Sequence, residues 1–416
     1  MKMNIGNQKL QKKFNRELIL NLMCQHGHLS RSQIAEKTGL GWGSITKYTA
    51  EMLRENLIKE VGEQKSKGRS SVILGLNKDF KYILGLDIGS SYIKGIVVNM
   101  GREECAFLRE ATLWNADRKT VLEQLFSFIE KLLEQAGITA DRLLAIGCGF
   151  AGGIDFESGT VKRAGNFSDF DQVPLAGILN ERFKTPCFVA NGITVRLLGE
   201  SISEQVKDND NVAYISLGTG VGAGIILHSK ILVPTEDERI GDIAHYMVEK
   251  KGPRCYCGLH GCLEALVGAR HLLDRVQKLL PESDSSLKNI SSPLSWEIIA
   301  ENANIDDPLV SCVLSEAGHY IGMALCGIIQ FHRPGLIILG GGMTNLGDRL
   351  IQPIKDEVSS FLPIERFDVD NIVISEQACR CGAAGATLYA WDNIFYSQHE
   401  YINLNLNKVP IKDSFK

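Results

Sequence analysis

The sequence predicts an α/β protein with a small helical head at its N-terminus and a larger two-lobed body. Charge is divided unevenly along the chain, the apolar pattern changes from helical to strand-like near residue 82, and a strand–glycine turn–strand unit occurs twice in the body. The 416 residues exceed one ordinary domain, and 44% hydrophobic with 23% charged residues is a soluble globular composition. We expect the head over 1–80, the first lobe over 81–190 with 385–416, and the second lobe over 191–384.

The charge distribution points to a nucleic-acid-binding module joined to a different kind of domain. Residues 1–81 carry 15 Lys and Arg against 7 Asp and Glu, whereas the rest carries 30 and 42. The basic N-terminus lacks an apolar signal core and no run reaches roughly 18 apolar residues, so we expect neither secretion nor membrane insertion. The 11 scattered cysteines favour reduced thiols in a cytoplasm over a disulfide framework.

The head has the pattern of a helix-turn-helix. Apolar residues at helical spacing from Phe14 to Met23 predict a first helix. Ser30 and Gln33 have the spacing of a capping box and begin a second helix, which Gly39 ends because glycine readily takes the left-handed conformation. A third helix is expected over about 43–56. Two short helices joined by a glycine-containing turn place the later one in the major groove of DNA.

A basic wing is expected to follow these helices, between two strands that run from about 59 to 74. Lysine and arginine in such a loop suit contacts with the DNA backbone or minor groove. The residues expected to face DNA are Ser32, Trp42, Ser44, Thr46, Lys47 and Tyr48 in the helices and Lys65, Lys67 and Arg69 in the wing. The alternative, a protein-interaction bundle with solvated lysines, explains the surplus positive charge less well.

The body repeats one plan, which suggests a duplicated fold with a cleft between two lobes. An apolar run over 82–91 is followed by a strand over 93–99, and 212–224 is followed by a strand over 225–227. In such turns, bare backbone N–H groups can surround a phosphate because glycine lets the main chain approach closely. A third glycine cluster, 340–342, lies between a strand and a helix and either seats a nucleotide or closes a βα connection.

One cluster of metal-ligand residues stands out. His245, Cys255, Cys257 and Cys262 supply one imidazole and three thiolates, the donor set of a closed tetrahedral structural zinc site. Chance association among 11 cysteines is the alternative, but a Cys-x-Cys pair embedded in glycines is poor material for a core. The sequence therefore predicts structural Zn²⁺.

Together these residues resemble the ROK family (repressors, open reading frames and kinases), and within it the winged-helix sugar-responsive repressors. The resemblance runs from about Phe14 to Trp391, and the segments 241–245 and 255–264 are similar to the family's signature. It implies an actin-like, hexokinase-like body whose cleft binds a sugar and, in the kinases, ATP.

By position, the resemblance also assigns roles to individual residues of the body. It implies phosphate or nucleotide loops at Asp87, Gly89 and Ser91, at Gly218, Thr219 and Gly220, and at Gly341 and Gly342. It implies sugar ligands at Asn166, Asn191, Asp242, His245 and Glu264. His245 would serve both zinc and sugar through its two ring nitrogens.

The chain departs from the kinase pattern where the chemistry is done. ROK kinases carry an aspartate as general base where this chain has Gly192, and glycine cannot accept a proton. General-base catalysis contributes about 10²–10⁴-fold in rate, so efficient phosphorylation is not expected. Asp155 and Asp169 are nearby carboxylates, but nothing in their spacing places them as substitutes. Asp242 and Ala244 also replace the family's usual Glu and Gly, which alters the predicted sugar contacts.

The sequence therefore predicts a cytoplasmic transcriptional regulator, a repressor of carbohydrate-utilisation genes. It would act without enzyme activity as a homodimer or homotetramer on operator DNA, with a monosaccharide effector, structural zinc and no membrane association. Effector binding would close the cleft and change the spacing of the heads through the connector 77–81. The alternatives are a sugar kinase with an added DNA-binding head, a constitutive DNA binder with a relic cleft, and an activator or architectural protein that ignores sugars.

Overall fold

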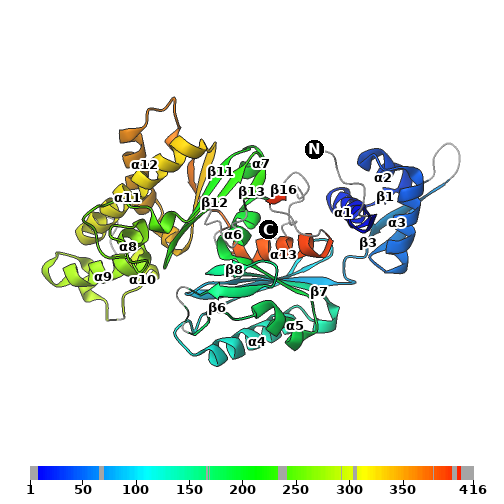
Figure 1. Cartoon of the computed structure of the whole chain (residues 1–416), viewed down its shortest axis with the longest axis horizontal. Coiled ribbons are helices and arrows are strands. Elements are labelled where there is room, and N and C mark those ends of the chain that lie inside the picture. The colour runs from blue at the N-terminus through cyan, green and yellow to red at the C-terminus, as the bar shows by residue number, and fades with distance from the viewer. Residues whose placement is uncertain are drawn as a thin grey trace. The chain divides into compact units, whose positions relative to one another are not determined.

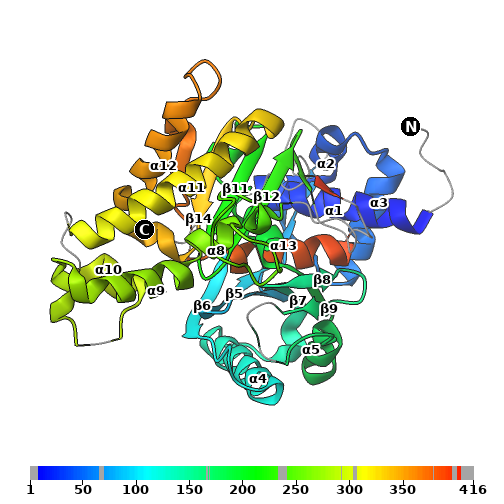
Figure 2. The same ribbon diagram turned by 60° about the vertical axis from the view of Figure 1, so that its left-hand side comes forward.

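The computed structural model describes residues 8–64, 70–164, 167, 169–232, 241–291, 293–302, 307–377, 379–395 and 401–403. The chain divides into two compact units, one formed by Met1–Ser203 with Cys379–Lys416 and the other by Glu204–Ala378. Both units combine helices with a central sheet, as Figures 1 and 2 show. The first unit contains the N-terminal head as well as the first lobe.

The head is a helix-turn-helix followed by a β-hairpin. Its helices are α1 (Gln8–His26), α2 (Arg31–Thr38) and α3 (Trp42–Arg54), and its strands are β1 (Leu29–Ser30), β2 (Ile58–Gln64) and β3 (Ser71–Leu76). The strands form an antiparallel sheet in the order β1-β3-β2. Both hydrogen bonds of the predicted capping box are present at Ser30 and Gln33, and Gly39 ends α2 with a φ of 69°.

The first lobe is built on a five-stranded sheet in the order β10-β7-β4-β5-β6. Its elements are β4 (Tyr82–Ile88), β5 (Tyr92–Asn99), β6 (Glu104–Ala111), α4 (Arg118–Gln135), η1 (Ala140–Arg142), β7 (Leu143–Phe150), β8 (Gly153–Asp155), β9 (Thr160–Arg163), α5 (Leu175–Phe183), β10 (Cys187–Asn191), α6 (Gly192–Glu200) and α13 (Cys381–Phe395). The predicted hairpin is confirmed, because β4 and β5 pair antiparallel, while β7 runs parallel to both β4 and β10.

The two faces of this sheet are covered by different helices. Alternate residues of a strand point to opposite faces, and Leu84, Leu86 and Ile88 of β4 pack in one core with α4 and α5. The other face lies against α13, and the approach is close: a Cβ at Gly147 would lie 1.9 Å from the carbonyl oxygen of Ala386. Figure 1 shows α4 and α5 on one side of the sheet and α13 on the other.

The second unit repeats the sheet-and-helix plan. Its elements are α7 (Glu204–Lys207), β11 (Val212–Leu217), β12 (Val221–Leu227), β13 (Lys230–Leu232), η2 (Ile243–His245), α8 (Leu263–Val267), α9 (Ala269–Leu279), η3 (Leu280–Glu282), η4 (Ser286–Asn289), α10 (Trp296–Asn302), α11 (Pro308–His332), β14 (Leu336–Gly340), η5 (Gly342–Leu346), α12 (Asp348–Phe361), η6 (Val369–Asn371) and β15 (Ile372–Ile374). Its strands follow the order β15-β14-β11-β12-β13, with β11 antiparallel to β12 and parallel to β14. The last described strand of the chain is β16 (Tyr401–Asn403).

Among the described helices, α11 alone is long and apolar enough to cross a membrane by length and composition. Its residues Leu314, Ile321 and Leu325 are buried in the core of the second unit, where they pack with β11 and β14. A mostly buried core helix passes the same test, so this helix is weak evidence for a membrane span.

The boundaries between the two units differ from the lobe boundaries expected from the sequence. They divide it after 203 and after 378, whereas the sequence pattern places the boundaries after 190 and after 384. The difference arises because α6 and α13 pack on each other at very short range. A Cβ at Gly385 would lie 1.7 Å from the carbonyl oxygen of Val195, so both helices belong to the first unit.

Candidate functional site

Helix α3, the predicted recognition helix, presents a polar face with one large aromatic side chain. Trp42 is 60% exposed, and Thr46 and Lys47 on α3 and Ser32 on α2 are also exposed. The opposite face of α3 is buried through Ile45, Thr49 and Met52. The exposed face is therefore free of the head's own core.

Two of the residues predicted to face DNA lie partly inside the head. Ser44 and Tyr48 are half-buried, and Tyr48 packs on the head core while its hydroxyl accepts a hydrogen bond from Nδ2 of Asn15 at 3.4 Å. Arg31, which the sequence pattern did not single out, donates from Nε to Oγ1 of Thr49 at 3.0 Å and ties α2 to α3. The wing residues Lys65, Lys67 and Arg69 lie outside the described residues, between β2 and β3.

The first predicted phosphate loop is closed by an internal ion pair. Asp87, at the end of β4, is 2% exposed, and its two carboxylate oxygens accept hydrogen bonds from Nη2 and Nε of Arg196 at 3.0 and 3.1 Å. The same carboxylate lies against the first turn of α13, where a Cβ at Gly382 would be 2.4 Å from Oδ2. The guanidinium fork of Arg196 meets both carboxylate oxygens, so Asp87 has its counter-charge within the chain. Sequence reasoning missed Arg196, because only the fold brings it to Asp87.

Asn191 is the N-cap of α6, and its side chain hydrogen-bonds to the backbone on both sides of it. Its Oδ1 accepts a hydrogen bond from the N–H of Ile193 at 2.8 Å, and its Nδ2 donates to the carbonyl oxygen of Gly152 at 2.7 Å. Gly192 follows as the first helical residue, and a Cβ there would meet nothing closer than 3.4 Å. A Cβ at 192 would therefore make only ordinary contacts, so crowding at this atom does not explain why the chain has no aspartate here.

The two carboxylates near this region are committed elsewhere. Asp155 accepts hydrogen bonds from the backbone N–H groups of Glu157 and Ser158 and from the Ser158 hydroxyl, which lower its pKa as expected for a turn-capping carboxylate. Asp169 pairs with Arg118 at 3.0 Å. Asn166, the remaining predicted sugar ligand of the first lobe, lies outside the described residues.

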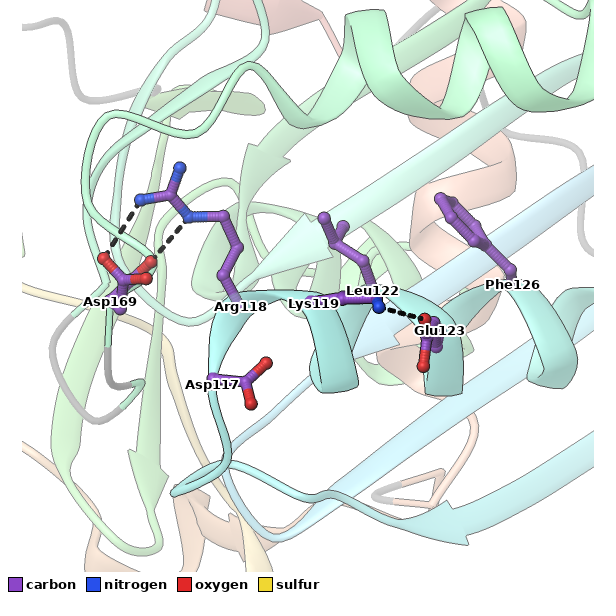
Figure 3. A pocket seen from close by; sticks show the side chains of 7 residues that line it. All are labelled: Asp117, Arg118, Lys119, Leu122, Glu123, Phe126 and Asp169. Carbon is purple, nitrogen blue, oxygen red and sulfur yellow. Dashed lines mark hydrogen bonds and ion pairs between the residues drawn. The ribbon is translucent and has the colours of Figure 1, made fainter.

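Asp169 also lines a hollow of about 510 Å³ at the start of α4. Figure 3 shows its walls, in which Arg118 points to Asp169 and Lys119 to Glu123. Both basic groups of this hollow are therefore paired with carboxylates, and the remaining carboxylate, Asp117, accepts a hydrogen bond from the N–H of Thr120 as the N-cap of α4. None of the predicted site residues lines it.

In the second unit, Glu264 anchors the second predicted phosphate loop. The loop links β11 to β12, and the Gly218 N–H donates to the carbonyl oxygen of Gly220 at 3.0 Å. Oε2 of Glu264 accepts a hydrogen bond from the Val221 N–H at 2.8 Å and lies where a Cβ at Gly220 would clash at 2.5 Å. The absent side chain at 220 therefore lets the carboxylate reach the loop.

Three of the predicted sugar ligands gather in the second unit. Burial raises the pKa of Glu264, and the negative charge of Asp242 raises it further. The hydrogen bond from the Val221 N–H and the charges of His245 and His271 act in the opposite direction. Asp242 is the N-cap of the short helix η2, His245 is the last residue of that helix, and Glu264 lies in the first turn of α8. The structure thus brings two carboxylates and one imidazole within electrostatic range of one another.

The predicted metal ligands converge on one point. The ligand atoms of His245, Cys255, Cys257 and Cys262 all lie within 4.8 Å of one another, and they are the one such group found among the described residues. Cys255 Sγ is 3.5 Å from His245 Nδ1, and Cys257 Sγ is 3.6 Å from Cys262 Sγ. With Zn–S of about 2.3 Å and Zn–N of about 2.0–2.1 Å, a tetrahedral ion holds a sulfur and a nitrogen ligand about 3.5–3.6 Å apart and two sulfur ligands about 3.8 Å apart. The donor set and these two distances fit zinc.

The loop that carries the predicted metal ligands is shaped by its own backbone hydrogen bonds. The N–H of Cys255 donates to the carbonyl oxygen of Leu259 at 2.7 Å, and the N–H of Gly258 donates to that of Cys255 at 3.0 Å. The ring of Tyr256 meets His245 edge-on at 5.0 Å between centroids. His260 lies near the carbonyl oxygen of Gly252 at 3.2 Å and is outside the ligand group.

Comparison with known proteins gives the same division of the chain. Residues 15–59 match a winged helix-turn-helix DNA-binding family, and residues 83–392 match the ROK family. The chain is 28% identical over 387 residues to the xylose repressor of Caldicellulosiruptor bescii, and the aligned region covers 92% of this chain and 96% of that protein. It is 28% identical over 390 residues to the DNA-binding transcriptional dual regulator NagC of Escherichia coli, with 92% and 93% covered.

Solved structures agree with this result. A ROK family transcriptional regulator, described as a homologue of the E. coli MLC protein, superimposes with a TM-score of 0.77 at 27% identity, covering 92% of this chain and 98% of that one. A ROK glucokinase from Streptomyces griseus in complex with glucose and AMPPNP superimposes with a TM-score of 0.63 at 24% identity, covering 74% and 99%, and shows that the body shares the kinase fold. The chain belongs to the ROK family, with a winged helix-turn-helix domain joined to an actin-like, hexokinase-like body.

Proposed function

We propose that this chain is a cytoplasmic, DNA-binding transcriptional repressor of carbohydrate-utilisation genes whose ROK body binds a monosaccharide effector. The observation that carries the proposal is the joining, in one chain, of an exposed recognition helix to a ROK body. Relatives that span almost the whole chain are named as a xylose repressor and an N-acetylglucosamine repressor. Xylose and N-acetylglucosamine are therefore the first effectors to test.

DNA binding is assigned to α3 and the wing. Trp42, Thr46 and Lys47 form the exposed face of α3, and Ser32 and the half-buried Ser44 and Tyr48 flank it. Lysine and arginine in the wing would neutralise DNA phosphates and so make the affinity fall with salt concentration. The test is the slope of log K against log salt: replacing both Lys67 and Arg69 by alanine should flatten it by about two units. An unchanged slope would reject the wing as a DNA contact.

Sugar binding is assigned to the residues that the family resemblance implies as sugar ligands. Asn191 in the first unit and Asp242, His245 and Glu264 in the second are amide, carboxylate and imidazole groups, which suit sugar hydroxyls. Asn166 is proposed as a fifth ligand from the sequence resemblance. Isothermal titration with xylose, glucose and N-acetylglucosamine tests this assignment, and binding that survives Glu264→Gln and Asp242→Asn unaltered would reject it.

The kinase reading is the second candidate, since the body has the fold of a glucokinase. Two observations weigh against it. Gly192 supplies no general base, and Arg196 occupies the Asp87 carboxylate of the first phosphate loop. An ADP-release assay with Mg-ATP and the same sugars separates the two candidates: sugar-dependent turnover would favour the kinase, and its absence with intact sugar binding would favour the repressor.

Structural zinc is proposed at His245, Cys255, Cys257 and Cys262 on the strength of their donor set and spacing. The imidazole and thiolates would hold the ion, and the ion would fix the loop that carries His245 next to Asp242. Metal analysis of the purified protein should give one zinc per chain. A protein without stoichiometric metal but with full effector binding would contradict the proposal.

A two-fold assembly is proposed because winged-helix repressors read palindromic operators with paired heads. Light scattering on the protein alone should give a mass of two or four chains, where one chain is 45.8 kDa. A monomer that still binds a single half-site specifically would reject the assembly and leave DNA recognition in place.

A further inference from the structure

The DNA-binding head is packed directly on the first lobe. A single hydrophobic cluster contains Ile19, Leu20 and Met23 of α1 together with Ala390 and Trp391 of α13. These five side chains are at most 1% exposed. Helix α1 lies beside α13 in both Figure 1 and Figure 2, and the two helices are in contact. Such burial is typical of a domain core rather than of a domain held only by a linker.

A buried arginine lies at the centre of this contact. Arg102, in the turn between β5 and β6, is 2% exposed and donates from Nη2 to Oδ1 of Asn21 in α1 at 2.9 Å. Its guanidinium carbon is 4.9 Å from the ring centroid of Trp391. Asn21 in turn donates from Nδ2 to Oε1 of the buried Glu17 at 3.3 Å. A buried charge is tolerated only with well-placed partners, so this network favours one docked position of the head.

The connector between head and lobe is fixed as well. On the head side, Asn77 donates its backbone N–H to Leu57 at 3.0 Å and its Nδ2 to the carbonyl oxygen of Asn56 at 3.1 Å. On the lobe side, the carbonyl oxygen of Lys78 accepts the N–H of Met100 at 2.9 Å, and Lys81 donates to the carbonyl oxygen of Asp141 at 2.6 Å. A hinge needs residues whose φ and ψ are free to change, and these hydrogen bonds oppose such change.

Helix α13 links the head to the part of the lobe that carries the candidate sugar ligand. Its N-terminal half packs on α6, whose N-cap is Asn191, and its C-terminal half packs on α1. The contact with α6 is so close that a Cβ at Gly385 would lie 1.7 Å from the Val195 carbonyl oxygen. Close-packed helices transmit displacement with little slack.

We infer that the head and the first lobe move as one rigid body, locked by Arg102, and that the connector 77–81 is not a hinge. The inference rests on the proposed function for its regulatory meaning. An effector that changes DNA affinity then displaces the first lobe and its head together. Arg102 is in this sense a positioning residue for the DNA-binding head.

A cross-link across the interface tests the inference directly. Cys24 of α1 has its Sγ 3.6 Å from the carbonyl oxygen of Met100, and both side chains are buried. The variant Met100→Cys, oxidised with glutathione disulfide and checked by peptide mass under non-reducing conditions, would join head to lobe. The locked protein is expected to bind DNA, and to be released by a sugar, within about 3-fold of its reduced form.

A loss of more than about 10-fold in either property on oxidation, restored by reductant, would overturn the inference. The matched control carries Met100→Cys with Cys24→Ser, which cannot form this bond and must not respond to the oxidant. If no sugar releases even the wild-type protein, the proposed effector response fails while the DNA-binding comparison still tests the lock.

Hydrogen exchange gives a second test that needs neither DNA nor disulfide. In a rigid body the amides of α1 and of β5 open with similar free energies, and Arg102→Ala should speed exchange in α1 without changing α4. Wild-type α1 amides that exchange about 100-fold faster than those of β5, or an Arg102→Ala variant with unchanged α1 exchange, would overturn the inference.

Discussion

Replacing Arg196 by alanine tests the assignment of an internal counter-charge in the first phosphate loop. The side chain of Asp87 is 3% exposed and that of Arg196 is 21% exposed, so the variant leaves a nearly buried carboxylate without its guanidinium partner. Breaking a buried pair in this way costs about 3–5 kcal/mol. We expect about 3 kcal/mol, because Arg196 is partly solvated and the N-terminus of α13 still favours the negative charge.

Urea unfolding followed by a probe in the first unit measures this loss. In a thermal melt, a loss of 1 kcal/mol lowers the melting temperature of a unit of this size by about 2–4 °C. The melting temperature should therefore fall by about 6–12 °C. The control is Arg118→Ala, whose pair with Asp169 is exposed and should cost less than about 1 kcal/mol. Adding Asp87→Asn to Arg196→Ala removes the uncompensated charge and should recover part of the stability. A loss below about 1 kcal/mol, or a double variant no more stable than the single one, would refute the reasoning.

Three further predictions concern DNA, packing and metal. Lys47→Ala on α3 should flatten the salt dependence of DNA binding by about one unit, whereas Lys119→Ala on the first lobe should leave it unchanged in the same anisotropy titration. Gly385→Ala should destabilise the first unit by about 3 kcal/mol or more, because the new methyl meets backbone of α6, whereas Gly177→Ala in α5 meets nothing within 4 Å and should stabilise by about 0.5–1 kcal/mol. Cys257→Ser should lose zinc and sugar response before DNA binding, and equal loss of both would mean that the metal supports the whole fold.

The parts of the molecule that local sequence rules control were predicted well. The capping box at Ser30 and Gln33, the left-handed Gly39 and the hairpins at 82–99 and 212–227 depend on residues close in the chain. The metal group could be predicted because its ligands lie within 18 residues of one another and only a few residue types bind zinc. The family resemblance was likewise inferred from short local motifs, and the comparison with the ROK family confirms it.

Long-range pairings could not be predicted from sequence. Arg196 meets Asp87 across 109 residues, and Arg102 meets Asn21 across 81, so neither pair leaves a periodic or spacing signal. The packing of α6 on α13 could not be predicted for the same reason, because it depends on two glycines far apart in the chain, Gly199 in α6 and Gly385 in α13. Tyr48 was predicted to face DNA from its position on α3, but the structure turns its hydroxyl toward Asn15 of α1.

The most direct test of the account is fluorescence anisotropy of the full-length protein on labelled DNA from upstream of its own and neighbouring genes, titrated with xylose, N-acetylglucosamine and glucose. The account predicts specific binding, with a dissociation constant on the order of 10⁻⁸ M or below, that one of these sugars weakens by about 10-fold or more. A protein that binds none of these fragments more tightly than random DNA, while turning over Mg-ATP with a sugar, would contradict it.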